Sequence, residues 1–261
     1  MIMQTEMKES LNRPKYIAFS TQKGGAGKTT ITVLVASYLH YVKNCNVAII
    51  DCDYPQYSAY DLRKRDKEKM MQDEYYQSMA AEMFERIGKG IYPVASSKAA
   101  DAIGLAERMT EKEGNLDYIF FDLPGTINNT AVISLLAEMD YVFCPIVADN
   151  VVMKSSIIFT ERFLKKMPGI KGCYLMWNMV DRGEKSEVYD LWAKVLEDLA
   201  VPVLKTQMPN MLRFRKEQGE ARKGVFRSTL FPPDKALLKG SNVEELSEEV
   251  LSIISSTEDE A

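Results

Sequence analysis

The chain has 261 residues, of which 46% are hydrophobic and 27% are charged, so it can bury the core of one large domain. Its net charge of −4 excludes a uniformly basic protein that coats nucleic acid, although a local basic patch is compatible with it. Four cysteines without paired spacing and a single histidine argue against a zinc or iron–sulfur centre and for a reducing cytoplasm. No apolar run reaches the roughly 18 residues that a membrane-spanning helix needs.

The two ends of the chain differ in composition from the part between them. Residues 1–14 are polar and lack the apolar block of a secretory signal, and residues 255–261 are rich in acidic side chains. We therefore expect a flexible N-terminal tail over 1–14, a single domain over 15–254 and an acidic tail over 255–261.

Between the ends, short β-branched and aromatic runs alternate with segments of helical periodicity. Strands are expected at residues 16–21, 47–51, 92–95, 118–122, 141–147, 173–178 and 201–207. Helices are expected around residues 31–42, 99–109, 131–139, 156–163, 188–199 and 243–254. Several of the strands are apolar at nearly every position, which is typical of parallel strands covered on both faces. The pattern predicts an α/β fold whose doubly wound, mostly parallel sheet is flanked by helices, with ligands at the carboxyl ends of the strands.

A glycine-rich loop joins the first expected strand to the first expected helix. Glycine lets backbone N–H groups turn towards phosphate oxygens, and the helix N-terminus adds its positive end. Lys28 is placed to contact the β- and γ-phosphates of ATP, and the Thr29 hydroxyl to ligate Mg²⁺. The sequence therefore predicts a phosphate cradle made of Gly24, Gly25, Ala26, Gly27, Lys28, Thr29 and Thr30.

The loop departs from the usual G-x-x-x-x-G-K-[ST] pattern, because Gln22 replaces the first glycine and Lys23 precedes Gly24. It resembles the deviant Walker A motif, K-G-G-x-G-K-[ST], of the ParA/MinD superfamily of P-loop ATPases. The resemblance implies a P-loop fold, an ATPase that uses ATP and Mg²⁺, and an ATP-dependent homodimer. It also implies that Lys23 reaches the nucleotide of the other subunit, so that Lys23 and Lys28 both act in catalysis.

Aspartates stand at the carboxyl ends of two of the expected buried strands. Asp51 and Asp53 follow one strand and Asp122 follows another, where an unpaired charge would be costly without a metal or phosphate site. The two segments resemble the superfamily's Walker A′ (D-x-D-P-Q) and Walker B (D-x-P-G) motifs. The resemblance implies that Asp53 positions the attacking water and that Asp51 and Asp122 join Thr29 in supporting Mg²⁺. Tyr54 is inserted before the proline, which leaves open whether Asp51 or Asp53 positions the water.

Two later loop residues are candidates for contacts with the nucleotide base. Asn178 ends the sixth expected strand, and its amide offers both a donor and an acceptor to an adenine edge. Pro209 follows the last expected strand and can lie against the ring. The superfamily uses these two places for adenine.

A basic stretch in the C-terminal half is a candidate DNA-binding surface. Residues 213–227 contain six basic side chains and two acidic ones, and concentrated cations attract DNA phosphates without reading the sequence. In the ParA branch, residues of this half bind nonspecific DNA. The candidate residues are Arg213, Arg215, Lys216, Arg222, Lys223 and Arg227.

The chain thus looks like a ParA-type ATPase that dimerises on ATP–Mg²⁺, binds DNA nonspecifically and drives DNA segregation or mobile-element maintenance or transfer. The resemblance implies a ParB-like or transfer-apparatus partner and a cytoplasmic, nucleoid-associated protein. The alternative is a MinD-like or metabolic P-loop ATPase that acts on a protein or small molecule without DNA. The polar face of the last expected helix is acidic rather than basic, which indicates a packing helix and no membrane partner.

Overall fold

The computed structural model describes residues 13–22, 24–125, 129–162, 164–181, 187–215 and 224–256. Most of the two predicted tails, residues 1–12 and 257–261, lies outside these ranges. The described end of the N-terminal tail packs on the domain, because the Arg13 guanidinium donates to both carboxylate oxygens of Asp140 at 2.9 and 3.0 Å.

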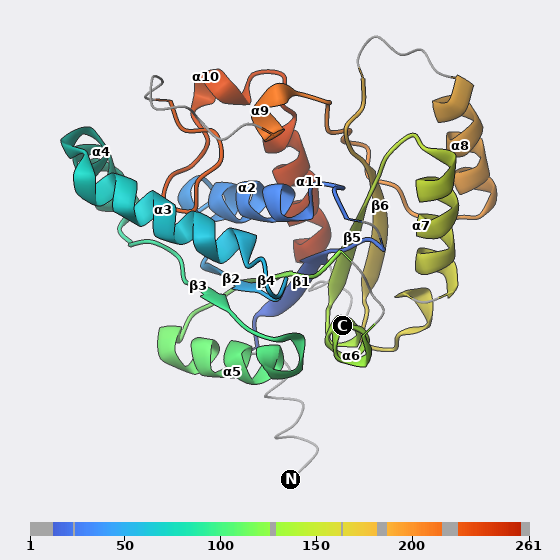
Figure 1. Cartoon of the computed structure of the whole chain (residues 1–261), viewed down its shortest axis with the longest axis horizontal. Helices are drawn as coiled ribbons and strands as arrows, with labels where there is room; N and C mark the ends of the chain where they lie inside the picture. Colours follow the sequence, from blue (N-terminus) through green and yellow to red (C-terminus); the bar gives the residue numbers. More distant parts are fainter. Residues whose placement is uncertain are drawn as a thin grey trace.

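The described residues form one six-stranded sheet in which all pairings are parallel. The spatial order is β3-β2-β4-β1-β5-β6, so β1 lies between β4 and β5 (Figure 1). The strands are β1 (Lys15–Phe19), β2 (Val47–Asp51), β3 (Val94–Ser96), β4 (Tyr118–Asp122), β5 (Tyr141–Ile146) and β6 (Gly172–Trp177). The predicted doubly wound parallel sheet is therefore confirmed.

The prediction of a seventh strand over residues 201–207 is wrong. This segment is joined to β6 by one parallel bridge, between Leu175 and Val203. Pro202 has no N–H to give to a ladder. The Leu204 N–H still donates to the Leu175 carbonyl of β6 at 2.8 Å, but those of Lys205 and Thr206 donate to the Glu249 carboxylate at 2.7 and 2.8 Å instead of to a strand.

Helices cover both faces of the sheet. One face carries α2 (Lys28–Tyr41), α3 (Ser58–Gln72), α4 (Glu74–Ile87) and α11 (Val243–Ser255). The other carries α5 (Ala102–Glu113), α6 (Thr130–Ala137), α7 (Asn150–Arg162) and α8 (Glu187–Asp198), as Figure 1 shows. Shorter elements are η1 (Ala99–Asp101), η2 (Leu164–Lys166), α9 (Leu212–Arg215) and α10 (Lys235–Leu238). Strand residues alternate between two apolar cores, with Ile17 and Phe19 in one and Ala18 in the other.

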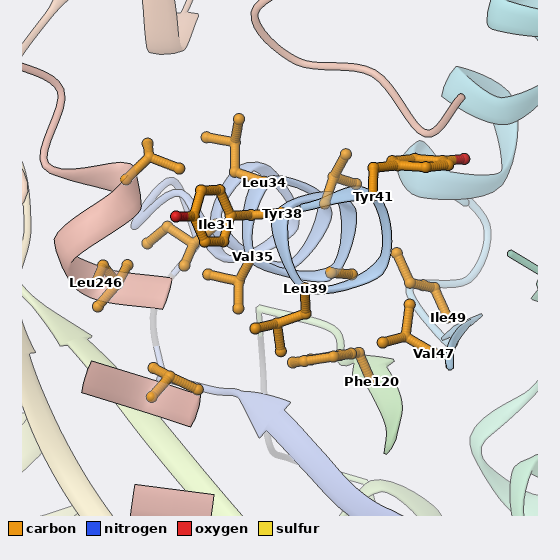
Figure 2. Packing of buried hydrophobic residues seen from close by; sticks show 14 of the residues in the cluster. Ile31, Leu34, Val35, Tyr38, Leu39, Tyr41, Val47, Ile49, Phe120 and Leu246 are labelled. Atoms are coloured by element: carbon orange, nitrogen blue, oxygen red, sulfur yellow. The ribbon is translucent and has the colours of Figure 1, made fainter. Parts of the chain in front are cut away.

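Helix α2 is buried almost all round, which fixes the direction of the glycine-rich loop at its start. Leu39 faces Phe120 of the sheet, and Ile31 and Val35 lie towards Leu246 of α11 (Figure 2). Helix α11 packs through its apolar side, as its sequence indicated, because Val243, Leu246, Val250 and Ile254 are all buried. Among the described residues, no helix combines the length and apolar character needed to cross a bilayer.

Candidate nucleotide-binding site

A cleft of about 800 Å³ opens at the carboxyl end of β1. This is where ligands bind in doubly wound sheets, because the connections on either side of the central strand run in opposite directions. Its volume is within the range of small-molecule sites. Among the predicted site residues, those that line it are Gly24, Gly25, Gly27, Lys28, Thr29, Thr30, Asp53, Asn178, Pro209 and Arg227.

The glycine-rich loop adopts a conformation that its glycines permit. Gly25 and Gly27 have φ of 78° and 77°, in the left-handed region that side chains disfavour. A Cβ on Gly27 would also lie 3.0 Å from Nδ2 of Asn178, which donates to the Ala26 carbonyl at 2.7 Å. Asn178 therefore supports the loop directly, while its side chain still borders the cleft. Lys23 lies outside the described residues.

The loop after β4 approaches the glycine-rich loop closely, so that a side chain at Gly125 would be crowded. A Cβ on Gly125 would lie 3.0 Å from the Cα of Gly24 and 3.5 Å from Nζ of Lys28. The Walker B-like segment and the phosphate cradle are therefore in van der Waals contact. The Lys28 side chain is almost fully enclosed, at 8% exposure.

The two carboxylates after β2 have different surroundings. The Asp51 carboxylate accepts three backbone N–H groups, from Asp53 at 3.1 Å, Ala59 at 2.8 Å and Tyr60 at 3.1 Å. It thereby anchors the first turn of α3. Asp53 is half-buried and lines the cleft. The pKa of Asp53 is raised by burial, and the nearby Lys28 ammonium offsets this rise only in part.

Asp122 is fully buried, and neither of its carboxylate oxygens has a hydrogen-bond partner among the described residues. Burial and the neighbouring Asp51 carboxylate raise the pKa of Asp122 to about 7, while the nearby Thr29 hydroxyl and Lys28 ammonium act in the opposite direction. A buried oxygen pair of this kind fits a cation. The described residues contain no cluster of three or more His, Cys, Asp or Glu side chains suited to a metal. One carboxylate and one hydroxyl nevertheless match Mg²⁺ that keeps waters and nucleotide phosphates as its other ligands.

The described side chains of the basic stretch, Arg213 and Arg227, make contacts within the domain. The Arg213 guanidinium lies 5.7 Å from the ring centroid of Phe226 and donates to the Leu237 carbonyl. Arg227 donates to Thr30 Oγ1 at 2.8 Å and borders the nucleotide cleft. Sequence reasoning missed this role of Arg227, because no local signal links two residues that are 197 positions apart. The Arg215 side chain, Lys216, Arg222 and Lys223 lie outside the described residues.

The family model described as the ATPase MipZ matches residues 15–153, which is just over half of the chain. Among curated proteins, the chain matches the uncharacterised protein BBD21 of Borreliella burgdorferi, with 51% identity over 45 residues. That match spans 17% of this chain and only 18% of the length of the relative.

Several solved structures share the fold at low identity. A protein described as a plasmid partition protein from Borrelia burgdorferi B31, bound to AMPPNP, gives a TM-score of 0.61 at 17% identity, over 94% of this chain and 99% of that one. The MinD cell division protein of Aquifex aeolicus gives 0.59 at 15%, over 92% and 97%. The pNOB8 ParA bound to nonspecific DNA gives 0.58 at 17%, over 93% and 99%.

Proposed function

The chain belongs to the MipZ family of ATPases, within the ParA/MinD superfamily, and from that premise we propose that it is a ParA-type molecular switch. It binds ATP with Mg²⁺, closes into a homodimer, binds DNA without sequence preference and reopens on hydrolysis. One observation carries the nucleotide part of the proposal. The glycine-rich loop, Asp53 and Gly125 meet in a single cleft, and the buried carboxylate of Asp122, whose oxygens have no hydrogen-bond partner among the described residues, lies three positions before Gly125 in the chain.

Each residue of the cleft has a distinct task in this proposal. The loop N–H groups and Lys28 bind the phosphates, and Asp53 orients the attacking water. Thr29 and Asp122 would hold Mg²⁺, which when bound would neutralise charge at the phosphates. The Asp51 carboxylate is engaged by three backbone N–H groups, which supports Asp53 rather than Asp51 as the residue that positions water. Asp51 would act on the metal shell only through its neighbour Asp122.

Base contacts come from Asn178 and Pro209, which also line the cleft. One N–H of the Asn178 amide is used on the Ala26 carbonyl, so its remaining donor and its oxygen are what an adenine edge would meet. In the dimer, Lys23 of each subunit would contact the phosphates bound by the other. This contact links nucleotide occupancy to dimer closure.

The DNA part of the proposal is supported by the basic composition of residues 213–227 and by the likeness in fold to a ParA solved with nonspecific DNA. Its cellular role would be segregation, maintenance or transfer of a DNA element, with a ParB-like or transfer-apparatus partner that stimulates turnover. Such a protein would be associated with the nucleoid.

A turnover assay with ATP, Mg²⁺ and duplex DNA, with no other substrate, tests the proposal. We expect ATP hydrolysis that needs Mg²⁺ and a dimer that forms with a non-hydrolysable ATP analogue. Hydrolysis that appears only after a small-molecule acceptor is added would support a metabolic enzyme instead. A dimer that closes on the ATP analogue and never binds DNA would support a MinD-like ATPase.

A further inference from the structure

A second, smaller cavity of about 160 Å³ lies beside the nucleotide cleft, between α3 and the segment 225–231. It shares Leu62, Arg65 and Arg227 with the larger cleft. We call it the basic hollow, because four of its lining residues are cationic: Arg65, Lys69, Arg213 and Arg227. Two of these come from α3, whose mixed charges alone indicate only a solvated helix face.

Among the described residues of the lining, Asp66 is the one acidic residue, and its carboxylate is already engaged. Its carboxylate accepts hydrogen bonds from the Thr229 N–H at 2.6 Å, the Thr229 hydroxyl at 2.8 Å and the Ser228 hydroxyl at 3.0 Å. All three bonds end on the same oxygen, Oδ2. Asp66 sets one formal negative charge against the four cationic residues of the described lining, which therefore has an excess of positive charge. Such an excess around a small cavity favours an anionic ligand.

Two of the cations lie over aromatic rings of the lining. The Lys69 ammonium lies 4.5 Å from the centroid of Tyr76, and the Arg213 guanidinium lies 5.7 Å from that of Phe226. Cation–π contacts restrict a long side chain without neutralising its charge. The positive ends are therefore positioned before a ligand arrives, which lowers the entropic cost of binding it.

A buried polar contact makes the two walls one rigid unit. Arg63 of α3 is 4% exposed, and it donates to the Thr229 hydroxyl at 2.9 Å and to the Thr229 carbonyl at 3.0 Å. Together with Asp66, it ties the segment 225–231 to α3. The geometry of the hollow is thus set by the fold and not by the ligand.

We propose that the basic hollow binds a backbone phosphate of nonspecific duplex DNA, and that Lys69 of α3 is a DNA-contacting residue. A volume of 160 Å³ is below that of sites for whole nucleotides but is sufficient for one phosphate group. This inference rests on the DNA binding of the proposed function and adds a helix that the basic C-terminal stretch does not include. Arg65 and Arg227 line both cavities, so ATP in the cleft and a DNA phosphate in the hollow would be bordered by the same two side chains.

A pair of substitutions on α3 tests the proposal. Lys69→Met removes the charge and keeps an apolar stem on Tyr76, and Lys67→Met is the matched control. Lys67 is exposed on the same helix and lines neither cavity. The full chain is titrated with labelled duplex DNA, in ATP analogue and Mg²⁺, over a range of salt concentrations. Thermal unfolding of each variant checks that it is folded.

We expect Lys69→Met to weaken DNA binding equally for unrelated sequences and Lys67→Met to leave it at the wild-type level. Each lost phosphate contact lowers the slope of log K against log salt by about 0.9, so a dimer changed in both subunits loses about 1.8. Equal affinities and slopes for the two variants, beside a wild type that binds DNA, would overturn this inference alone. A wild type that binds no DNA would overturn the proposed function together with it.

A second arm distinguishes DNA phosphate from free phosphate. Inorganic phosphate is titrated into the protein without DNA, and binding is followed by calorimetry. If Lys69→Met abolishes phosphate binding and leaves DNA affinity unchanged, the hollow takes a free anion, and the assignment to DNA is wrong. If both fall together, the DNA assignment is supported.

Discussion

Asp51 and Asp122 are register partners on the adjacent strands β2 and β4, and both side chains are fully buried. Their hydrogen bonding is nevertheless opposite. Asp51 accepts three backbone N–H groups, whereas both Asp122 oxygens have no partner among the described residues. The two carboxylates thus occupy equivalent positions in the sheet with different surroundings. That of Asp51 holds the start of α3, and that of Asp122 is the one that we propose binds Mg²⁺.

Replacing Asp122 by asparagine should stabilise the nucleotide-free protein and abolish Mg²⁺-dependent hydrolysis. The pKa of Asp122 is raised to about 7 in the folded state, above its usual value of 3.8. The folded state therefore disfavours the charged form, and the penalty grows as pH rises from about 4 to 7. We expect Asp122→Asn to raise the free energy of unfolding at pH 8 by on the order of 1–4 kcal/mol. A lower melting temperature than that of the wild type would contradict this account of Asp122.

Asp53→Ala and Asp51→Ala should fail in different ways. Asp53→Ala should keep ATP affinity, lower turnover by a factor on the order of 100 or more, and accumulate the closed dimer. Asp51→Ala should destabilise the fold by roughly 2–4 kcal/mol, because it leaves three backbone N–H groups without their acceptor. Chemical denaturation and single-turnover hydrolysis separate the two effects. Normal turnover in a folded Asp53→Ala protein would move the water-positioning role elsewhere.

Lys28→Ala should weaken binding of a fluorescent ATP analogue by about 10- to 100-fold, because it removes a charge-assisted contact to the phosphates. Lys112→Ala is the matched control, since Lys112 is exposed on α5, on the opposite face of the sheet. The control should bind the analogue as the wild type does. Equal affinities in both variants would refute the assignment of the phosphate cradle.

His40 should stay neutral through the physiological range. It is 5% exposed, and its ring nitrogens face the carbonyls of Cys45 and Gly90 at 3.1 and 2.9 Å. Burial lowers the pKa of His40 to about 4, against the opposing effect of the two carbonyls. As the chain contains one histidine, the untagged protein gives a single imidazole signal in proton NMR. We expect no titration of that signal between pH 8 and 5.

The lowered pKa of His40 also makes the folded state less stable at acid pH. Below its unfolded pKa of about 6.5, the unfolded chain takes up a proton that the folded chain refuses, so stability falls as pH falls towards 4. The contribution reaches about 3 kcal/mol at pH 4, at about 1.4 kcal/mol for each pH unit. A His40→Gln variant should lose this part of the pH dependence. Parallel unfolding curves for variant and wild type from pH 7 to pH 5 would contradict the assignment.

The fold follows from the sequence wherever a segment's own residues decide its conformation. Buried runs such as Val47–Asp51 are apolar at nearly every position, so strand and sheet type are readable in advance. Residues 201–207 begin with a similar apolar run, interrupted by Pro202 and ending at Leu204. There the outcome depends on Pro202 and on the Glu249 carboxylate, which takes two N–H groups from another part of the chain. Such a competitor leaves no trace in the local pattern.

The candidate site shows the same difference between features that the local sequence sets and features that depend on distant segments. The glycine-rich loop predicts the position of Lys28 and Thr29, because their spacing and the strand–helix context are local. The pairing of Arg227 with Thr30, and the support that Asn178 gives to Ala26, arise from contacts between distant segments. The unequal hydrogen bonding of Asp51 and Asp122 is likewise invisible in the sequence, where both simply close an apolar strand.

In the switch that we propose, ATP, and not ADP, puts the protein in the form that binds DNA. This claim is tested most directly by fluorescence anisotropy of labelled duplexes of unrelated sequence, titrated with the full chain and Mg²⁺ in a non-hydrolysable ATP analogue or in ADP. The account predicts tight, salt-sensitive binding of every duplex with the ATP analogue and loss of that binding in ADP. Affinity that is the same in both nucleotides, or that is confined to one sequence, would contradict it.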